Sequence, residues 1–186
     1  ILQSYQIGET IRLDGPESHL VKEGTPTMGG IIVLLAVILP SFLWAKLSDK
    51  HILLILLATI WMGAIGFLDD YLKVVKKYPS GLIARYKMAG QIILGSFVGY
   101  MIIAYPTVSE LRTTISVPFI ANGHLDIGWF YIPLFILVIT GTSNAVNLTD
   151  GLDGLATGLV AIATLVFGAI AYASGRFDYS DYLNIL

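Results

Sequence analysis

The chain has 186 residues, of which 55% are hydrophobic and only 13% are charged, and its formal net charge is −2. A soluble domain carries about 25% charged residues, so this composition favours a membrane protein. The lack of a basic surplus argues against a nucleic-acid partner. Cysteine is absent, which excludes disulfides, thiolate metal ligands and a cysteine nucleophile.

Five apolar segments come close to the roughly 20 residues that a helix needs to cross a bilayer. In chain order they are residues 29–46, 52–68, 88–105, 129–147 and 155–173. The first contains Pro40, which is expected to kink the helix. Glycines that allow close helix packing occur in the third and the fifth, namely Gly90, Gly95, Gly99, Gly158 and Gly168. The sequence therefore predicts an all-α polytopic membrane protein, with about five transmembrane helices in a single integral membrane domain that spans residues 1–186.

The connections between five spans alternate between the two sides of the membrane. Seven of the 11 Lys and Arg residues fall on the side that carries residues 1–28, 69–87 and 147–154. The positive-inside rule places these loops in the cytoplasm. On the opposite side, residues 113–128 alternate briefly between apolar and polar side chains and contain an Asn-Gly pair at 122–123. This pattern is typical of a short β-hairpin in an outer loop.

Two aspartates, Asp69 and Asp70, directly follow the second apolar segment, at the expected C-terminal end of its helix. The partial negative charge of a helix C-terminus disfavours carboxylates, and adjacent carboxylates repel each other. A cation would offset this cost, either Mg²⁺ or lysines such as Lys73 and Lys76. The alternative is an ordinary solvated helix end, because charges at membrane edges are common and only those inside spans indicate function by default.

A second polar stretch, NAVNLTDGLDGLA, places Asn144, Asn147, Asp150 and Asp153 at three-residue steps. Carboxylate and carbonyl oxygens suit Mg²⁺, which takes few protein ligands together with substrate phosphates. Glycines such as Gly151 let the backbone approach a ligand closely. The alternative is a turn that is simply rich in Asn, Asp and Gly.

A third stretch, KEGTPTMGG, brings Lys22, Thr25 and Thr27 to the start of the first apolar segment. Free N–H groups at a helix N-terminus attract anions, although ordinary helix-entry chemistry explains the same residues. The stretch is not a P-loop, because GxxxxGK[ST] is absent.

The second predicted cytoplasmic loop is basic. Its positive charge either reflects the positive-inside rule and attraction to anionic lipid or captures a polyanionic substrate, and both explanations can hold. The basic residues are Lys73, Lys76, Lys77, Arg85 and Lys87.

Taken together, GTPTMGG (24–30), FLDDYLK (67–73) and NAVNLTDGLDGLA (144–156) resemble the polyprenyl-phosphate N-acetylhexosamine-1-phosphate transferases of glycosyltransferase family 4. The longer loop DGPESHLVKEGTPTMGG is similar to that of the branch which acts on UDP-MurNAc-pentapeptide. The resemblance covers nearly the whole chain, whereas family members have about ten spans. The chain is therefore expected to be a fragment that corresponds to spans two to six.

The resemblance implies a Mg²⁺-dependent enzyme that transfers phospho-MurNAc-pentapeptide from UDP-MurNAc-pentapeptide to undecaprenyl phosphate, giving lipid I and UMP for peptidoglycan synthesis. It also implies a multi-pass protein of the bacterial cytoplasmic (inner) membrane, in contact with membrane lipids, with its active site facing the cytoplasm; homodimers are common in the family. One alternative is a GlcNAc-1-phosphate transferase of the same superfamily. A membrane transporter is a more distant one, because no Asp, Glu, Lys or Arg lies at the centre of a predicted span.

Carried over onto this sequence, the resemblance makes Asp69 and Asp70 catalytic residues. Together with Asp150 they are also expected to bind Mg²⁺, with a further ligand outside this chain. Gln91 follows Lys87 in a KxxxQ pattern. The residues expected to bind the substrates are Lys22, Thr27, Lys73, Lys87, Asn144, Asn147, Gly151 and Asp153.

Overall fold

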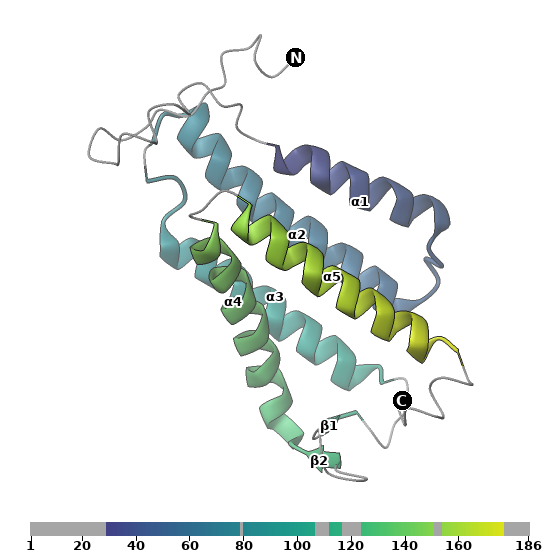
Figure 1. Cartoon of the computed structure of the whole chain (residues 1–186). Helices are drawn as coiled ribbons and strands as arrows, with labels where there is room; N and C mark the ends of the chain where they lie inside the picture. The colour runs from purple at the N-terminus through teal and green to yellow at the C-terminus, as the bar shows by residue number, and fades with distance from the viewer. Residues whose placement is uncertain (1–28, 79, 107–111, 117–123, 151–153, 177–186) are drawn as a thin grey trace. The chain divides into compact units, whose positions relative to one another are not determined.

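The computed structural model describes residues 29–78, 80–106, 112–116, 124–150 and 154–176. These residues form five α-helices, one short 3₁₀ helix and one small sheet (Figure 1). In chain order the elements are α1 (Gly30–Trp44), α2 (Lys50–Val74), α3 (Ala84–Ala104), β1 (Thr114–Ser116), β2 (His124–Asp126), η4 (Gly128–Phe130), α4 (Tyr131–Thr149) and α5 (Leu155–Ser174). The chain divides into two units, residues 1–140 and 141–186, and each is described by itself.

Most of the helices in the described residues are long and apolar enough to cross a bilayer. The four segments of this kind are Lys50–Val74, Ala84–Ala104, Gly128–Thr149 and Leu155–Ser174. α1 has 15 residues and is shorter than the roughly 20 that a perpendicular crossing needs. Many large apolar side chains on these helices are exposed, for example Leu43 and Leu165, as expected of surfaces that face lipid. The prediction of an all-α polytopic membrane protein is confirmed.

α2 extends further than its apolar segment indicates. Its N-terminus is capped by Asp49, whose carboxylate accepts a hydrogen bond of 2.8 Å from the backbone N–H of His51. Its C-terminus is at Val74, so Asp69 and Asp70 lie inside the helix. The expectation that they follow the helix is wrong, because hydropathy marks the edge of the apolar segment while the backbone hydrogen bonds of α2 continue through the polar residues beyond it.

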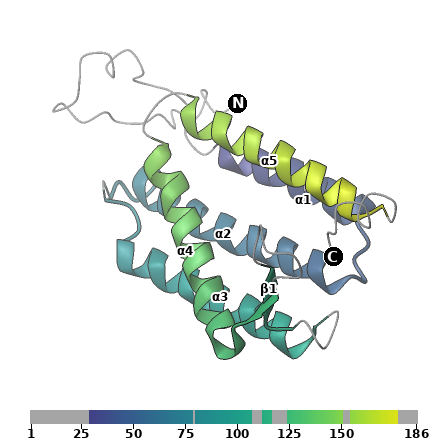
Figure 2. The same ribbon diagram turned by 60° about the horizontal axis from the view of Figure 1, so that its bottom comes forward.

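α1, α2 and α3 are consecutive antiparallel neighbours, which both ribbon views show (Figures 1 and 2). α1 approaches α2 closely at Gly63, where a Cβ atom would lie 2.6 Å from Leu34 Cδ1. α2 and α3 are linked near their middle by a hydrogen bond of 3.0 Å from Trp61 Nε1 to the carbonyl of Gly90. The indole N–H thereby gains the partner that a polar group in a bilayer requires.

α3 buries a single stripe, whose spacing of three and four residues puts its members on one helix face. Two of its glycines adjoin the N-terminal half of α4. A Cβ atom at Gly95 would lie 2.8 Å from Ile136 Cα, and one at Gly99 would lie 3.4 Å from Ile132 Cα. Close packing at Gly95 and Gly99 agrees with the prediction, whereas among the described residues a Cβ atom at Gly158 or Gly168 of α5 would meet nothing within 4 Å. The stripe consists of Gln91, Leu94, Gly95, Val98 and Gly99.

β1 and β2 form the predicted hairpin, paired antiparallel with Ile115 opposite Leu125. The Asp126 carboxylate accepts hydrogen bonds from the Thr113 hydroxyl at 2.6 Å and from the Gly128 N–H at 2.9 Å. These donors hold the pKa of Asp126 below its usual value. The Asn-Gly pair at 122–123 lies outside the described residues.

Candidate functional site

The centre of the candidate site is Asp69, a buried carboxylate near the C-terminus of α2 with 8% of its surface exposed. Its Oδ2 lies 2.9 Å from Lys73 Nζ, one helical turn further along α2. Its Oδ1 lies 2.8 Å from Lys87 Nζ in the first turn of α3. Oδ1 also accepts a hydrogen bond of 2.7 Å from the backbone N–H of Leu82. We call these three charged side chains, Asp69, Lys73 and Lys87, the Asp69 cluster.

A tight turn between α2 and α3 brings the Leu82 N–H to Asp69. After α2, Lys77 takes a left-handed backbone conformation with φ 53°, and the Gly81 N–H donates to the Tyr78 carbonyl at 2.9 Å. Gly81 is itself buried and left-handed, with φ 58°. Glycine adopts this region without steric cost, so the turn can pack directly against the Asp69 carboxylate.

The Asp69 cluster contains one more positive than negative charge. Burial of Asp69 is tolerated because two ammonium groups and one N–H satisfy its oxygens. The Lys73 and Lys87 side chains are 45% and 29% exposed, so both ammonium groups remain within reach of a ligand. A pair of lysines held close together in this way suits a polyanion such as a diphosphate.

Two further residues lie beside the Asp69 cluster in the fold. Gln91 lies one turn after Lys87 on the buried stripe of α3, and only 4% of its surface is exposed. Asp70 is the next residue of α2 and is half-buried. Since adjacent helical residues point about 100° apart, Asp70 occupies a different face of α2 from Asp69.

The described residues do not by themselves form a metal centre. Within them, no group of three or more His, Cys, Asp or Glu side chains gathers closely enough to hold a metal ion. Both carboxylate oxygens of Asp69 already accept from nitrogen donors, two of which are cationic. Three of the roughly four lone-pair sites of this carboxylate therefore already face nitrogen donors.

The other predicted residues that the structure describes lie at the end of α4, in the second unit. α4 continues through Asn144 and Asn147 to Thr149, and the Asp150 N–H still donates to the Val146 carbonyl at 3.1 Å. Asn144, Asn147 and Asp150 are all exposed. Their three-residue steps are therefore helical steps, and α5 begins just beyond, after Gly154 with φ 76°.

Four of the predicted substrate-binding residues lie outside the described part of the chain. They are Lys22, Thr27, Gly151 and Asp153. Their gathering with the Asp69 cluster stays a prediction.

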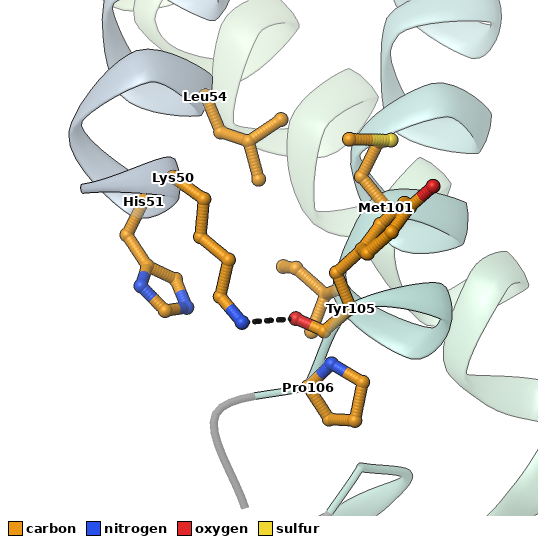
Figure 3. A pocket seen from close by; sticks show the side chains of 7 residues that line it. Lys50, His51, Leu54, Met101, Tyr105 and Pro106 are labelled. Carbon is orange, nitrogen blue, oxygen red and sulfur yellow. Dashed lines mark hydrogen bonds between the residues drawn. The ribbon is translucent and has the colours of Figure 1, made fainter. Parts of the chain in front are cut away.

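A pocket lies at the opposite end of the α2–α3 pair from Asp69 (Figure 3). There the Lys50 ammonium group donates to the backbone carbonyl of Tyr105, and His51 Nδ1 lies 3.2 Å from the Asp49 carboxylate. The other residues that line this pocket are mainly apolar, with Leu54 and Met101 among them. These polar groups lie at the ends of α2 and α3.

Sequence reasoning missed two parts of the Asp69 cluster's surroundings, namely Gly81 and the Leu82 N–H. A backbone N–H is present in every residue except proline, so the residue type does not reveal that it acts as a donor here. The one available signal is the Pro-Ser-Gly sequence at 79–81, which is typical of a turn but does not tell where the turn closes.

The fold and this site define a helical membrane protein with a lysine-rich charged cluster at one end of its helices. A family model for glycosyl transferase family 4 matches residues 52–186, and a signature described as phospho-N-acetylmuramoyl-pentapeptide-transferase signature 1 matches residues 22–34. The chain therefore belongs to glycosyl transferase family 4, which confirms the resemblance noted in the sequence.

Several curated bacterial proteins named phospho-N-acetylmuramoyl-pentapeptide-transferase are similar to the chain. The protein of Chlorobaculum parvum is 50% identical over 177 residues, which are 95% of this chain and 48% of the relative. That of Chlorobium chlorochromatii is 49% identical over 97% of the chain and 49% of the relative. That of Pelobacter propionicus is 48% identical over 100% of the chain and 51% of the relative. The chain spans about half the length of the curated relatives it matches.

Proposed function

We propose that the complete protein transfers phospho-MurNAc-pentapeptide from UDP-MurNAc-pentapeptide to undecaprenyl phosphate, forming lipid I and releasing UMP in peptidoglycan synthesis. The similarity to relatives that carry the transferase name supports this proposal. The observation that carries it within the structure is the Asp69 cluster, in which a buried carboxylate holds two lysines at the end of a membrane helix. A site at that level can meet both a lipid-borne phosphate and a soluble nucleotide.

The proposed reaction is an in-line displacement at the β-phosphorus of the UDP-sugar. An oxygen of the lipid phosphate forms the new P–O bond, and the bond between the β-phosphorus and the bridging oxygen breaks, so that UMP leaves with the electron pair. A phosphate monoester has a second pKa of about 6, so the attacking phosphate is already mostly a dianion at neutral pH. Catalysis then depends on positioning and charge stabilisation more than on a general base.

The roles of the residues follow from these requirements. We assign Lys73 and Lys87 to the diphosphate, where their ammonium groups offset charge that develops on the leaving UMP. Asp69 holds the two lysines at a fixed separation. The catalytic role of Asp70 rests on the family resemblance. From the family resemblance, the uridine and phosphate pocket would be completed by Lys22, Thr27, Asn144, Asn147, Gly151 and Asp153.

A requirement for Mg²⁺ is part of the proposal and depends on the family resemblance. When bound, the ion would supply further charge neutralisation at the diphosphate. The predicted ligands are Asp69, Asp70 and Asp150, with one more outside this chain, and Asp69 is the one whose oxygens are already engaged.

The proposal places the protein in the bacterial cytoplasmic membrane with the Asp69 cluster on the cytoplasmic side. The distribution of Lys and Arg in the sequence supports this orientation. Residues 1–28, 69–87 and 147–154 would then share one aqueous compartment. The homodimer stays a prediction, which mass measurement in detergent would test.

The proposal is tested by release of UMP from purified full-length protein. We expect UMP release that requires UDP-MurNAc-pentapeptide, undecaprenyl phosphate and Mg²⁺ together. UDP-GlcNAc, offered in parallel, should not replace the muramoyl substrate. Release from UDP-GlcNAc alone would assign the protein to the GlcNAc-1-phosphate transferases, and no release from either nucleotide would refute the proposal.

A further inference from the structure

We propose that Gly81 is a positioning residue for this reaction: by letting the turn close onto Asp69, it holds the ammonium groups of Lys73 and Lys87 where the diphosphate binds. This inference rests on the proposed function for its kinetic consequence, whereas its geometric part concerns this chain alone. The sequence pattern assigns neither Gly81 nor Leu82 to the site.

A side chain at Gly81 would force the Asp69 and Lys73 side chains to move. A Cβ atom there would overlap Asp69 Oδ1 and would lie 2.7 Å from Lys73 Cε. The Asp69 carboxylate is buried and accepts a hydrogen bond from this turn, so displacing it would disrupt these contacts. The backbone of Gly81 is also in the left-handed region, with φ 58°, which disfavours any L side chain.

The turn also supplies the third donor to Asp69. Without the Leu82 N–H at 2.7 Å, Oδ1 would be held by Lys87 alone, whose ammonium group sits at the end of a long side chain on another helix. The backbone donor is rigid by comparison. It fixes the direction of the carboxylate, and through it the separation of the two ammonium groups.

The test is Gly81→Ala in the full-length protein. We expect kcat for UMP release to fall about hundredfold, the loss that a misplacement of about 1 Å can cause, with a smaller change in KM for the UDP-sugar. A kcat effect is expected because the fixed lysines stabilise charge that is greatest in the transition state. A wild-type kcat would overturn the inference.

A matched control separates backbone strain from contact with Asp69. Gly128 also has a positive φ, 52°, but a Cβ atom there would meet nothing within 4 Å. Gly128→Ala should therefore keep kcat. If both alanine variants lowered kcat equally, strain alone would explain the result and the inference would be wrong.

A second readout follows the lysines directly and does not need activity. In Gly81→Ala, acylation of Lys87 by an amine-reactive reagent should accelerate relative to the exposed Lys76, measured by peptide mass spectrometry. Unchanged Lys87 reactivity together with a lowered kcat would indicate a merely structural role and would overturn the inference. If the wild-type protein released no UMP, the proposed function would fail, and Lys87 reactivity would still decide the geometry.

If Gly81→Ala does not fold, the α-hydroxy analogue of leucine at position 82 replaces it. This change removes the Leu82 N–H and adds no atom to the turn. We expect lower kcat and faster acylation of Lys87, and wild-type values for both would overturn the inference.

Discussion

Replacing Lys87 with methionine should destabilise the protein more than replacing Lys73, although both lysines pair with the same carboxylate. The Lys87 side chain is 29% exposed and the Asp69 side chain 11%. A hydrogen bond to a charged group contributes about 1.5–3 kcal/mol, and we expect a loss of this size in Lys87→Met. The Lys73 side chain is 45% exposed and lies one turn away on the same helix. Such exposed pairs contribute about 0–1 kcal/mol, so Lys73→Met should be mild.

The assay is the free energy of unfolding in mixed detergent micelles. Lys76→Met serves as the control for loss of an exposed positive charge and should change the stability by less than about 0.5 kcal/mol. A double-mutant cycle gives the sharper result. In an Asp69→Asn background, Lys87→Met should lose most of its effect, because the Asp69 negative charge that Lys87 neutralises is no longer present. Equal losses for the two lysines, or an undiminished effect in that background, would refute the reasoning.

Three other outcomes are expected from the structure. Gly95→Ala should lower the free energy of unfolding by about 1–3 kcal/mol through overpacking against the α4 backbone, whereas Gly99→Ala should be milder; equal melting temperatures would contradict this. Because the chain has no cysteine, single cysteines at Ser80 and Leu125 can be labelled, and an impermeant maleimide applied outside intact cells should react only at position 125. Since hydrogen bonds lower the pKa of Asp126, the stability they give the hairpin should persist at neutral pH and be lost as the pH falls through that lowered value, as followed by NMR titration.

The helices and the hairpin were predictable because each follows from a local pattern. Apolar segments of nearly span length mark most of the helices, and a brief alternation marks the hairpin. The helix end at Val74 was not predictable from hydropathy, because the backbone continues its hydrogen bonds into polar residues. Hydropathy indicates whether a segment lies in lipid or in water, whereas the end of a helix is set by its backbone hydrogen bonds.

The candidate site was predictable where its contacts are local. Lys73 follows Asp69 by one helical turn, so the sequence already named it as a compensating cation. The contact between Leu82 and Asp69 joins residues 13 apart and depends on how a turn closes. The geometry of this turn comes from two residues with a left-handed backbone, Lys77 and Gly81. Lysine is not among the residue types that favour this conformation, so the sequence does not indicate it at position 77.

α2 and α3 are joined by polar contacts at three levels along their length. Lys50 contacts the Tyr105 carbonyl at one end, Trp61 contacts Gly90 in the middle, and Asp69 meets Lys87 at the other end. Helices adapt to the thickness of a bilayer mainly by tilting, and these two can tilt only as one body. Lengthening the acyl chains of the lipid should therefore reorient the pair while the distances within the Asp69 cluster stay the same.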